Sequence, residues 1–218
     1  MRVLALAAAL AVLTARGQSP QAAPTLQAGF SNPGLVPPQW TLTLHPDGTG
    51  HFSSRMGDRP REASGDLLPP VIDRDIQVSA PFAAHVFQVA GRHAWFNQDC
   101  ESHQKVAFQG WKTFTYTGPE GHGSCTFNYS RDKEIQALGD SFEAVAETIV
   151  EGARLQMLLE HDPLGLDAEM EFLVGAANDG RAQQIVTIRG ILERLAQDER
   201  VLERVRKRAR LLLAHEPT

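Results

Sequence analysis

The sequence predicts an α+β protein in which an antiparallel sheet is covered by helices and followed by an all-helical C-terminal extension. Trp40, Leu42 and Leu44 alternate with threonines, which is the period of a half-buried strand. Apolar residues between 135 and 149 advance by three and four, as on one face of a helix. Beyond residue 161 the apolar residues follow helical spacing only. The element order of the first part is therefore ββ-β-α-ββ-α.

The composition indicates a folded protein. The chain has 218 residues, of which 42% are hydrophobic and 22% charged, and these values lie near the globular average. A chain of this length can bury a sizeable core without a metal or a disulfide. Its formal net charge is −5, and it contains no nucleic-acid recognition motif. We therefore expect no nucleic-acid partner.

Residues 1–17 have the pattern of a signal peptide. Arg2 precedes an apolar run over Val3–Leu13, and Ala15 and Gly17 supply small side chains at the −3 and −1 positions of a cleavage site. The run is shorter than the roughly 20 residues that span a bilayer. We expect an exported protein, periplasmic or extracellular, with no transmembrane segment in the mature chain.

Residues 18–38 contain mainly Gln, Ala, Pro, Ser and Gly, with few large apolar side chains. Such a segment buries too little surface to offset the entropy of ordering it. The sequence therefore predicts a flexible tether here.

An α+β domain is predicted over residues 39–161. It begins with a hairpin that turns at Pro46–Gly50, and a proline-rich loop over Gly57–Pro70 leads to a third strand over residues 72–78. Ser79 is placed as the N-cap of a short helix.

A second hairpin is predicted over residues 114–129, and Ser130 with Asp132 opens the long helix that follows it.

Three further helices are predicted in the extension, residues 162–218. Asp167 is expected to cap the first, which Gly180 ends. Apolar residues from Ile185 to Leu195 mark the second, and Asp198 is expected to cap the last. Three helices of about 12 to 16 residues resemble a small bundle or the start of an α-solenoid, and the absence of a repeated sequence argues against a repeat array.

The layout resembles a known group of small exported bacterial domains. The predicted order is hairpin, strand, helix, hairpin, helix. It begins with the strand Trp40-Thr41-Leu42-Thr43-Leu44 and the turn Pro46-Asp47-Gly48. It is similar to emfourin-like inhibitors of thermolysin-type proteases over about residues 39–150. The resemblance implies an α+β fold and, as one alternative, a secreted metalloprotease inhibitor, and it assigns no inhibitory residue.

Cys100 and Cys125 are the two cysteines of the chain. In an oxidising compartment such a pair is expected to form a disulfide. A closed loop of about 25 residues would stabilise the fold by on the order of 3 kcal/mol.

A zinc site or a thiol enzyme is the alternative for the same region. Cys100-x-x-His103 and His122-x-x-Cys125 form two half-sites that together supply the four ligands of a tetrahedral zinc ion. Alternatively, Cys125 is a nucleophile and His122 its base. No other cofactor is predicted.

A basic run lies near the C-terminus. Its members are Arg204, Arg206, Lys207, Arg208 and Arg210. They could contact an anionic membrane or an acidic partner. The simpler interpretation is a solvated helix face whose cations favour the C-terminal end of the helix dipole.

The function predicted from these observations is non-catalytic: a protein-binding or envelope-associated module. The alternatives are the secreted metalloprotease inhibitor and the zinc or thiol enzyme. The first interpretation expects an exposed apolar or aromatic patch. The sequence leaves the partner and the oligomeric state open.

Overall fold

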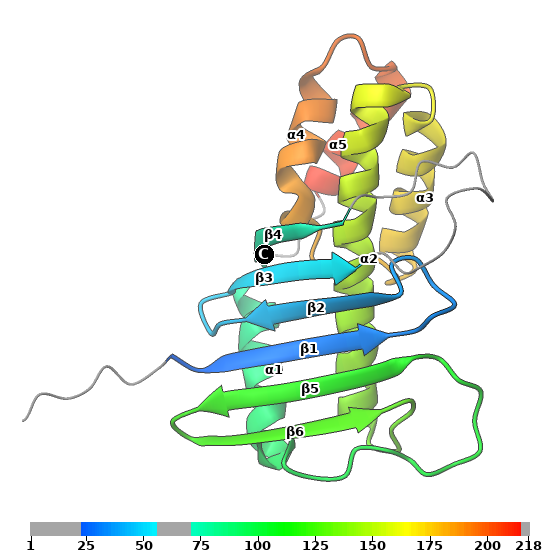
Figure 1. Ribbon diagram of the computed structural model, residues 1–218. Coiled ribbons are helices and arrows are strands. Elements are labelled where there is room, and N and C mark those ends of the chain that lie inside the picture. Colours follow the sequence, from blue (N-terminus) through cyan, green and yellow to red (C-terminus); the bar gives the residue numbers. More distant parts are fainter. Residues whose placement is uncertain (1–22, 56–70, 215–218) are drawn as a thin grey trace, which may run out of the picture.

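The computed structural model describes residues 23–55 and 71–214, which form a six-stranded antiparallel sheet and five α-helices (Figure 1). The strand order is β4-β3-β2-β1-β5-β6. The predicted α+β class with C-terminal helices is confirmed. The strands are β1 (Thr25–Ser31), β2 (Gln39–Leu44), β3 (Thr49–Arg55), β4 (Asp73–Gln77), β5 (Trp111–Gly118) and β6 (Gly121–Phe127).

The first predicted hairpin consists of β2 and β3. Its turn requires Gly48, whose φ of 82° lies in the left-handed region. Asp47 closes the turn, because its Oδ1 accepts hydrogen bonds from the backbone N of Thr49 at 2.9 Å and from the Thr49 hydroxyl at 2.6 Å. Leu42 then pairs with Phe52 on the buried face.

The prediction of a flexible tether over residues 18–38 is wrong for residues 25–31, which form β1 near the middle of the sheet. Leu26, Ala28 and Phe30 are buried on one face, while the intervening residues are Gln, Gly and small hydroxyl residues. Because β2 and β5 pair with both edges of β1, backbone hydrogen bonds stabilise a strand of modest hydrophobicity. The predicted signal peptide and the loop over residues 57–70 lie outside the described residues.

One face of the sheet is covered by α1 (Ala80–Arg92) and by the first half of α2 (Lys133–His161). Ser79 caps α1 as predicted, since its hydroxyl accepts from the backbone N of Phe82 at 3.4 Å. The N-cap of α2 is Asp132, which accepts from the backbone N of Glu134 and of Ile135. A 3₁₀ turn, η1 (Ala94–Phe96), follows α1.

The remaining helices pack around the second half of α2, beyond the β4 edge of the sheet (Figure 1). They are α3 (Leu166–Asn178), the 3₁₀ turn η2 (Ile185–Ile188), α4 (Arg189–Gln197) and α5 (Glu203–Ala214). Arg74 of β4 joins the two parts by donating to the carbonyl of Thr187 at 2.8 Å.

Two predicted helix caps are wrong. Gly165 is the N-cap of α3, so Asp167 lies inside its first turn, where a negative charge favours the helix dipole. Asp198 follows the end of α4 and accepts from the backbone N of Arg200 at 3.0 Å, while α5 begins only at Glu203. A side chain that can cap a helix can equally close a turn.

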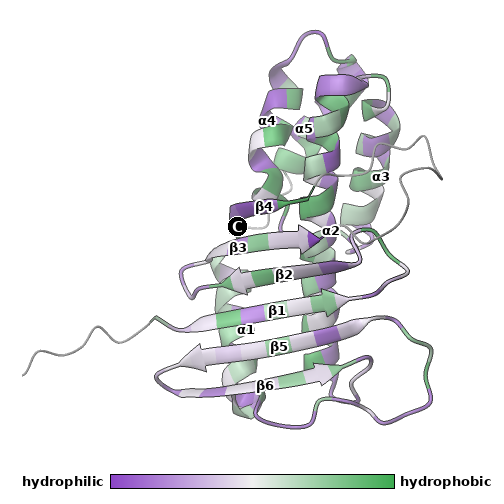
Figure 2. Cartoon of the chain, in the orientation of Figure 1, coloured by the Kyte–Doolittle hydropathy of each residue, from purple (hydrophilic) through white to green (hydrophobic). Residues whose placement is uncertain are grey.

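The molecule has two hydrophobic cores, and α2 contributes to both. Ile135 to Val150 of α2 pack in the core beneath the sheet, whereas Leu155 and Leu158 pack in the core of the bundle. The expected boundary after residue 161 coincides with the end of α2, but the cores divide inside this helix. Figure 2 shows hydrophobic and polar residues alternating along the strands. In the described ranges, no helix is long and apolar enough to cross a membrane.

Candidate functional site

Cys100 and Cys125 lie together as the sequence predicted, with their sulfurs 2.04 Å apart in a disulfide. Cys125 is on the buried face of β6, and Cys100 is on the segment that follows η1. The backbone N of Ser102 donates to the carbonyl of Tyr129 at 2.8 Å, and the backbone N of Asn128 donates to Glu101 at 2.7 Å. The disulfide and these bonds hold the segment against the chain at the end of β6.

The four residues of the proposed zinc site do not come together. His122 is exposed and lies three residues from Cys125 in β6, so the two side chains are on opposite faces of the strand. His103 instead contacts Asp99, with Nε2 2.6 Å from its Oδ2. Among the described residues no group of three or more His, Cys, Asp or Glu could hold a metal ion. The same placement separates His122 from Cys125 as a general base.

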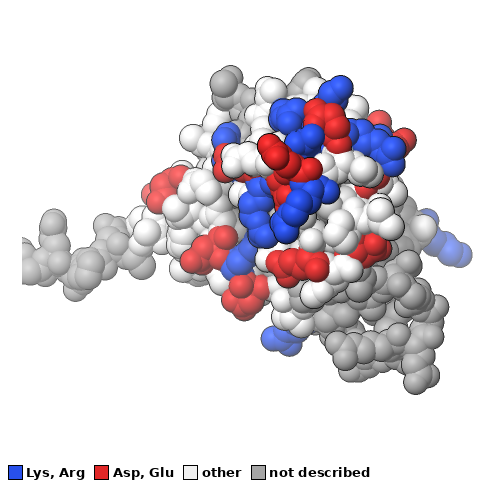
Figure 3. Space-filling model, turned by 90° about the horizontal axis from the view of Figure 1, so that it is seen from above, with Lys and Arg blue, Asp and Glu red and all other residues white. Residues whose placement is uncertain are grey.

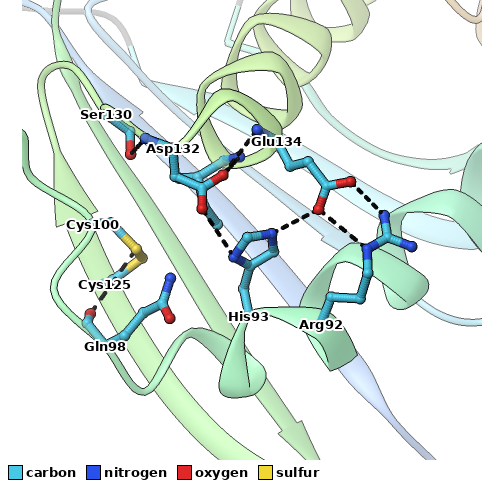
Figure 4. Close-up of polar contacts among 9 residues, drawn as sticks. Arg92, His93, Gln98, Cys100, Cys125, Ser130, Asp132 and Glu134 are labelled. Atoms are coloured by element: carbon cyan, nitrogen blue, oxygen red, sulfur yellow. Dashed lines mark hydrogen bonds and ion pairs between the residues drawn. A yellow bond between two sulfur atoms is a disulfide. The ribbon is translucent and has the colours of Figure 1, made fainter.

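His93 joins the end of α1 to the start of α2 (Figure 4). Its Nε2 is 2.8 Å from Oε2 of Glu134 and its Nδ1 is 3.4 Å from Oδ2 of Asp132, while Arg92 donates to both carboxylate oxygens of Glu134. These bonds from His93 and Arg92 hold the pKa of Glu134 below its usual value. Cations at a helix C-terminus and anions at an N-terminus both favour the dipoles, so the cluster is a structural clamp.

The basic run on α5 is largely paired with acidic residues. Asp167 of α3 receives Arg204 and Arg208, each at 2.6 Å, and Arg208 also contacts Glu171 at 2.9 Å. On α5 itself, Glu203 pairs with Arg206 and Arg210, and Lys207 lies between them in the sequence. Figure 3 looks down on the bundle end and shows acidic and basic side chains interspersed. This mixture favours the interpretation as a solvated helix face. The predicted dipole contribution is wrong, because the run lies in the first part of α5 and no basic residue is in its last turn.

The sheet face opposite α1 and α2 carries polar side chains. Hydroxyl residues dominate it: Thr41, Thr43, Ser53, Thr113, Thr115, Ser124 and Thr126. Some of these hydroxyls bond across strands, as between Thr113 and Thr126 at 2.9 Å and between Thr115 and Ser124 at 2.8 Å. We call this surface the open face.

A shallow depression of about 290 Å³ lies at one end of the open face. Gly29 forms its floor, because this residue of β1 has no side chain between Thr41 and Thr113 of the neighbouring strands. The indole of Trp111, which is 47% exposed, forms one side.

Exposed apolar side chains gather beside the depression, on two loops and at the first residue of β5. They are Leu35, Val36, Val106, Phe108 and Trp111. Phe108 packs edge-on against Trp111, with ring centroids 5.9 Å apart. Asn32 connects the two loops by donating to the carbonyl of Gln109 at 3.1 Å. We call the depression and these loops the loop end of the sheet.

Sequence reasoning missed the loop end because residues 18–38 were interpreted as a tether. The signal that could have found it is the alternation of Leu26, Ala28 and Phe30, which places Gly29 on the opposite face of a strand. Trp111 precedes the predicted second hairpin and gave no pattern of its own.

Comparison with known proteins finds no family model and no curated protein that matches this chain.

Proposed function

We propose that this chain is an exported, non-catalytic module that binds a component of the cell envelope through the loop end of its sheet. The observation that carries the proposal is the exposed aromatic pair Phe108–Trp111 beside the depression in the open face. Monomeric proteins rarely leave such side chains together on the surface, and aromatic residues are enriched where partners bind.

Export is supported by two features of the chain. Residues 1–17 have the composition of a signal peptide, and the mature part pairs its cysteines, as proteins of oxidising compartments do. Intact-mass analysis of protein from the producing cell tests this part. We expect a chain that begins at Gln18 and is lighter than its reduced form by two hydrogens. Cytoplasmic protein that still begins at Met1 would contradict export.

Binding is tested by co-sedimentation with washed envelope fractions. The double variant Phe108→Ser/Trp111→Ser should bind at least about tenfold more weakly than the wild type, because interface aromatics contribute most to such affinities. Phe172→Ser is the matched control, since Phe172 is an aromatic residue on α3 that is 41% exposed and lies outside the loop end. Equal sedimentation of all three proteins, or sedimentation of none, would refute the proposal.

A further inference from the structure

The depression presents a straight row of side chains that crosses four strands. Arg55 of β3 is opposite Gln39 of β2, Gln39 is opposite Ser31 of β1, and Ser31 is opposite Trp111 of β5. All four lie on the open face, because the residues next to them in each strand are buried on the other face. With neighbouring strands about 4.8 Å apart, the row extends roughly 14 Å across the sheet.

The charge of the lining excludes several ligand classes. The described residues that line the depression include no carboxylate and no histidine, so these residues offer no anionic or imidazole ligand to a metal ion. Arg55 is the only cation among the described lining residues, whereas phosphate and nucleic-acid sites gather several. The lining therefore favours an uncharged ligand.

The backbone of the row excludes a peptide that adds as a strand. Such a peptide needs a free sheet edge, and the edges here are β4 and β6. The row lies on β5, β1, β2 and β3, which are bonded to neighbours on both sides. A ligand of the row must bind through the side chains.

The chemistry of the row matches a sugar chain. A half-exposed indole offers a flat apolar surface on which the C–H face of a sugar ring can stack. A hydroxyl, an amide and a guanidinium then follow in line, and each donates hydrogen bonds to hydroxyl groups. Gln39 and Ser31 share only a long hydrogen bond of 3.5 Å, and Arg55 is exposed at the end of β3.

We infer that the row Trp111–Ser31–Gln39–Arg55 binds an uncharged oligosaccharide segment of an envelope glycan. Trp111 stacks on one sugar ring, and the three polar side chains bond to hydroxyls of the rings that follow. Gly29 leaves the space in which the sugar rings lie. The inference rests on the proposed function and deepens it by naming the chemical class of the envelope component.

The test is titration with cellotetraose, chitotetraose and maltotetraose, followed by tryptophan fluorescence and calorimetry. We expect saturable binding of at least one of them to the wild type. Trp111→Ala removes the stacking surface, and Gly29→Val fills the depression. A Cβ at Gly29 would meet Thr113 at 3.9 Å, which is ordinary van der Waals contact, so the strand accepts this change. Each variant should bind at least about tenfold more weakly. Thr43→Val, on the open face but outside the depression, should bind normally.

The outcomes separate this inference from the proposed function. The sugar site is overturned if the wild type binds none of the three sugars saturably. It is also overturned if the folded Trp111→Ala and Gly29→Val variants bind as well as the wild type. If the wild type nevertheless sediments with envelopes and loses this binding after protease treatment of the envelopes, the ligand is a protein and only the sugar site fails. If it neither sediments nor binds sugar, both proposals fail.

Discussion

The two cores that share α2 are filled by different kinds of side chain. The core beneath the sheet contains the buried aromatic residues Phe30, Trp40, Phe52, Phe96, Phe114, Tyr116, Phe127 and Phe142. The buried residues of the bundle core are Leu, Ile, Val, Ala and Met. Aromatic rings fill the space between the sheet and the helices that cover it, whereas aliphatic side chains interdigitate between the helices of the bundle. The difference therefore follows from the layers that each core joins.

The surfaces of the two parts differ in the same way. The bundle pairs its surface charges within itself, as Asp167 does with Arg204 and Arg208. The sheet leaves one face uncovered by the described helices, with hydroxyls, a glycine floor and an exposed indole. We infer that the sheet carries the binding surface and that the bundle stabilises α2, the helix that packs against the other face of the sheet.

The largest expected effect comes from cutting a cavity in either core. Phe114 contacts the rings of Phe96, Phe127 and Phe142, so Phe114→Ala should cost about 3–5 kcal/mol. Leu192→Ala is the matched change in the fully buried bundle core and should cost about 2–5 kcal/mol. Because α2 belongs to both cores, each variant should lower one shared unfolding transition. Near- and far-ultraviolet circular dichroism during denaturation would check this, and two separate transitions would show that the cores unfold independently.

Removing the disulfide should have the next largest effect. Cys100→Ser/Cys125→Ser opens a loop with a sequence separation of 25 and should lower the free energy of unfolding by about 3 kcal/mol. Reduction of the wild type should lower its free energy of unfolding by a similar amount, as measured by chemical denaturation. The variant should not respond to reductant. Equal stability of wild type and variant would mean that the bonds around Ser102 and Asn128 hold the segment without the disulfide.

The sheet shows how far the sequence could predict this fold. Alternation found β2 and the second hairpin because their buried positions include large apolar residues such as Leu42 and Phe114. The turn at Pro46–Gly50 predicted β3, whose buried positions are Gly50, Phe52 and Ser54. Alternation missed β1, whose central residues are Ala28 and Gly29, because pairing on both edges stabilises this strand and pairing partners are not visible in a local pattern.

The buried polar groups show a second limit. Lys112 is buried on the inner face of β5, where Nζ is 2.8 Å from Oε1 of Glu143 on α2. A sequence pattern gives no reason to place a lysine in a core, and only the tertiary contact supplies its partner. The candidate site also depends on tertiary contacts that a local sequence pattern does not show. The disulfide could be predicted from the number of cysteines and the expected compartment, but the row from Trp111 to Arg55 depends on the strand order.

A smaller effect is expected at the contact between α2 and α3. Burial and, after it, hydrogen bonding to Glu169 raise the pKa of Glu151 to about 9, against the attraction of Arg154. The folded state therefore holds a proton that the unfolded state releases above its usual pKa of 4.5, so stability falls as pH rises from about 4.5 to 9.

Glu151→Gln keeps a hydrogen-bond donor for Glu169 and removes the titration. It should stabilise the protein by on the order of 2 kcal/mol at pH 8 and have little effect at pH 4.5. Thermal melts over this pH range measure the difference. A wild type and a variant with parallel pH profiles would show that Glu151 is not protonated in the folded state.

The smallest effect is expected on the bundle surface, at Asp167. Bonds from Arg204 and then Arg208 lower the pKa of this partly exposed carboxyl, so its contribution to stability is present above the usual value of 3.8 and is lost as pH falls below it. Asp167→Asn should reduce the melting temperature slightly at neutral pH and low salt, and the difference should vanish in high salt because exposed pairs are screened. The variant also unpairs two arginines of α5. If it gains binding to anionic vesicles while the wild type has none, the ion pairs with Asp167 of α3 are what keep the basic run of α5 from acting as a binding surface.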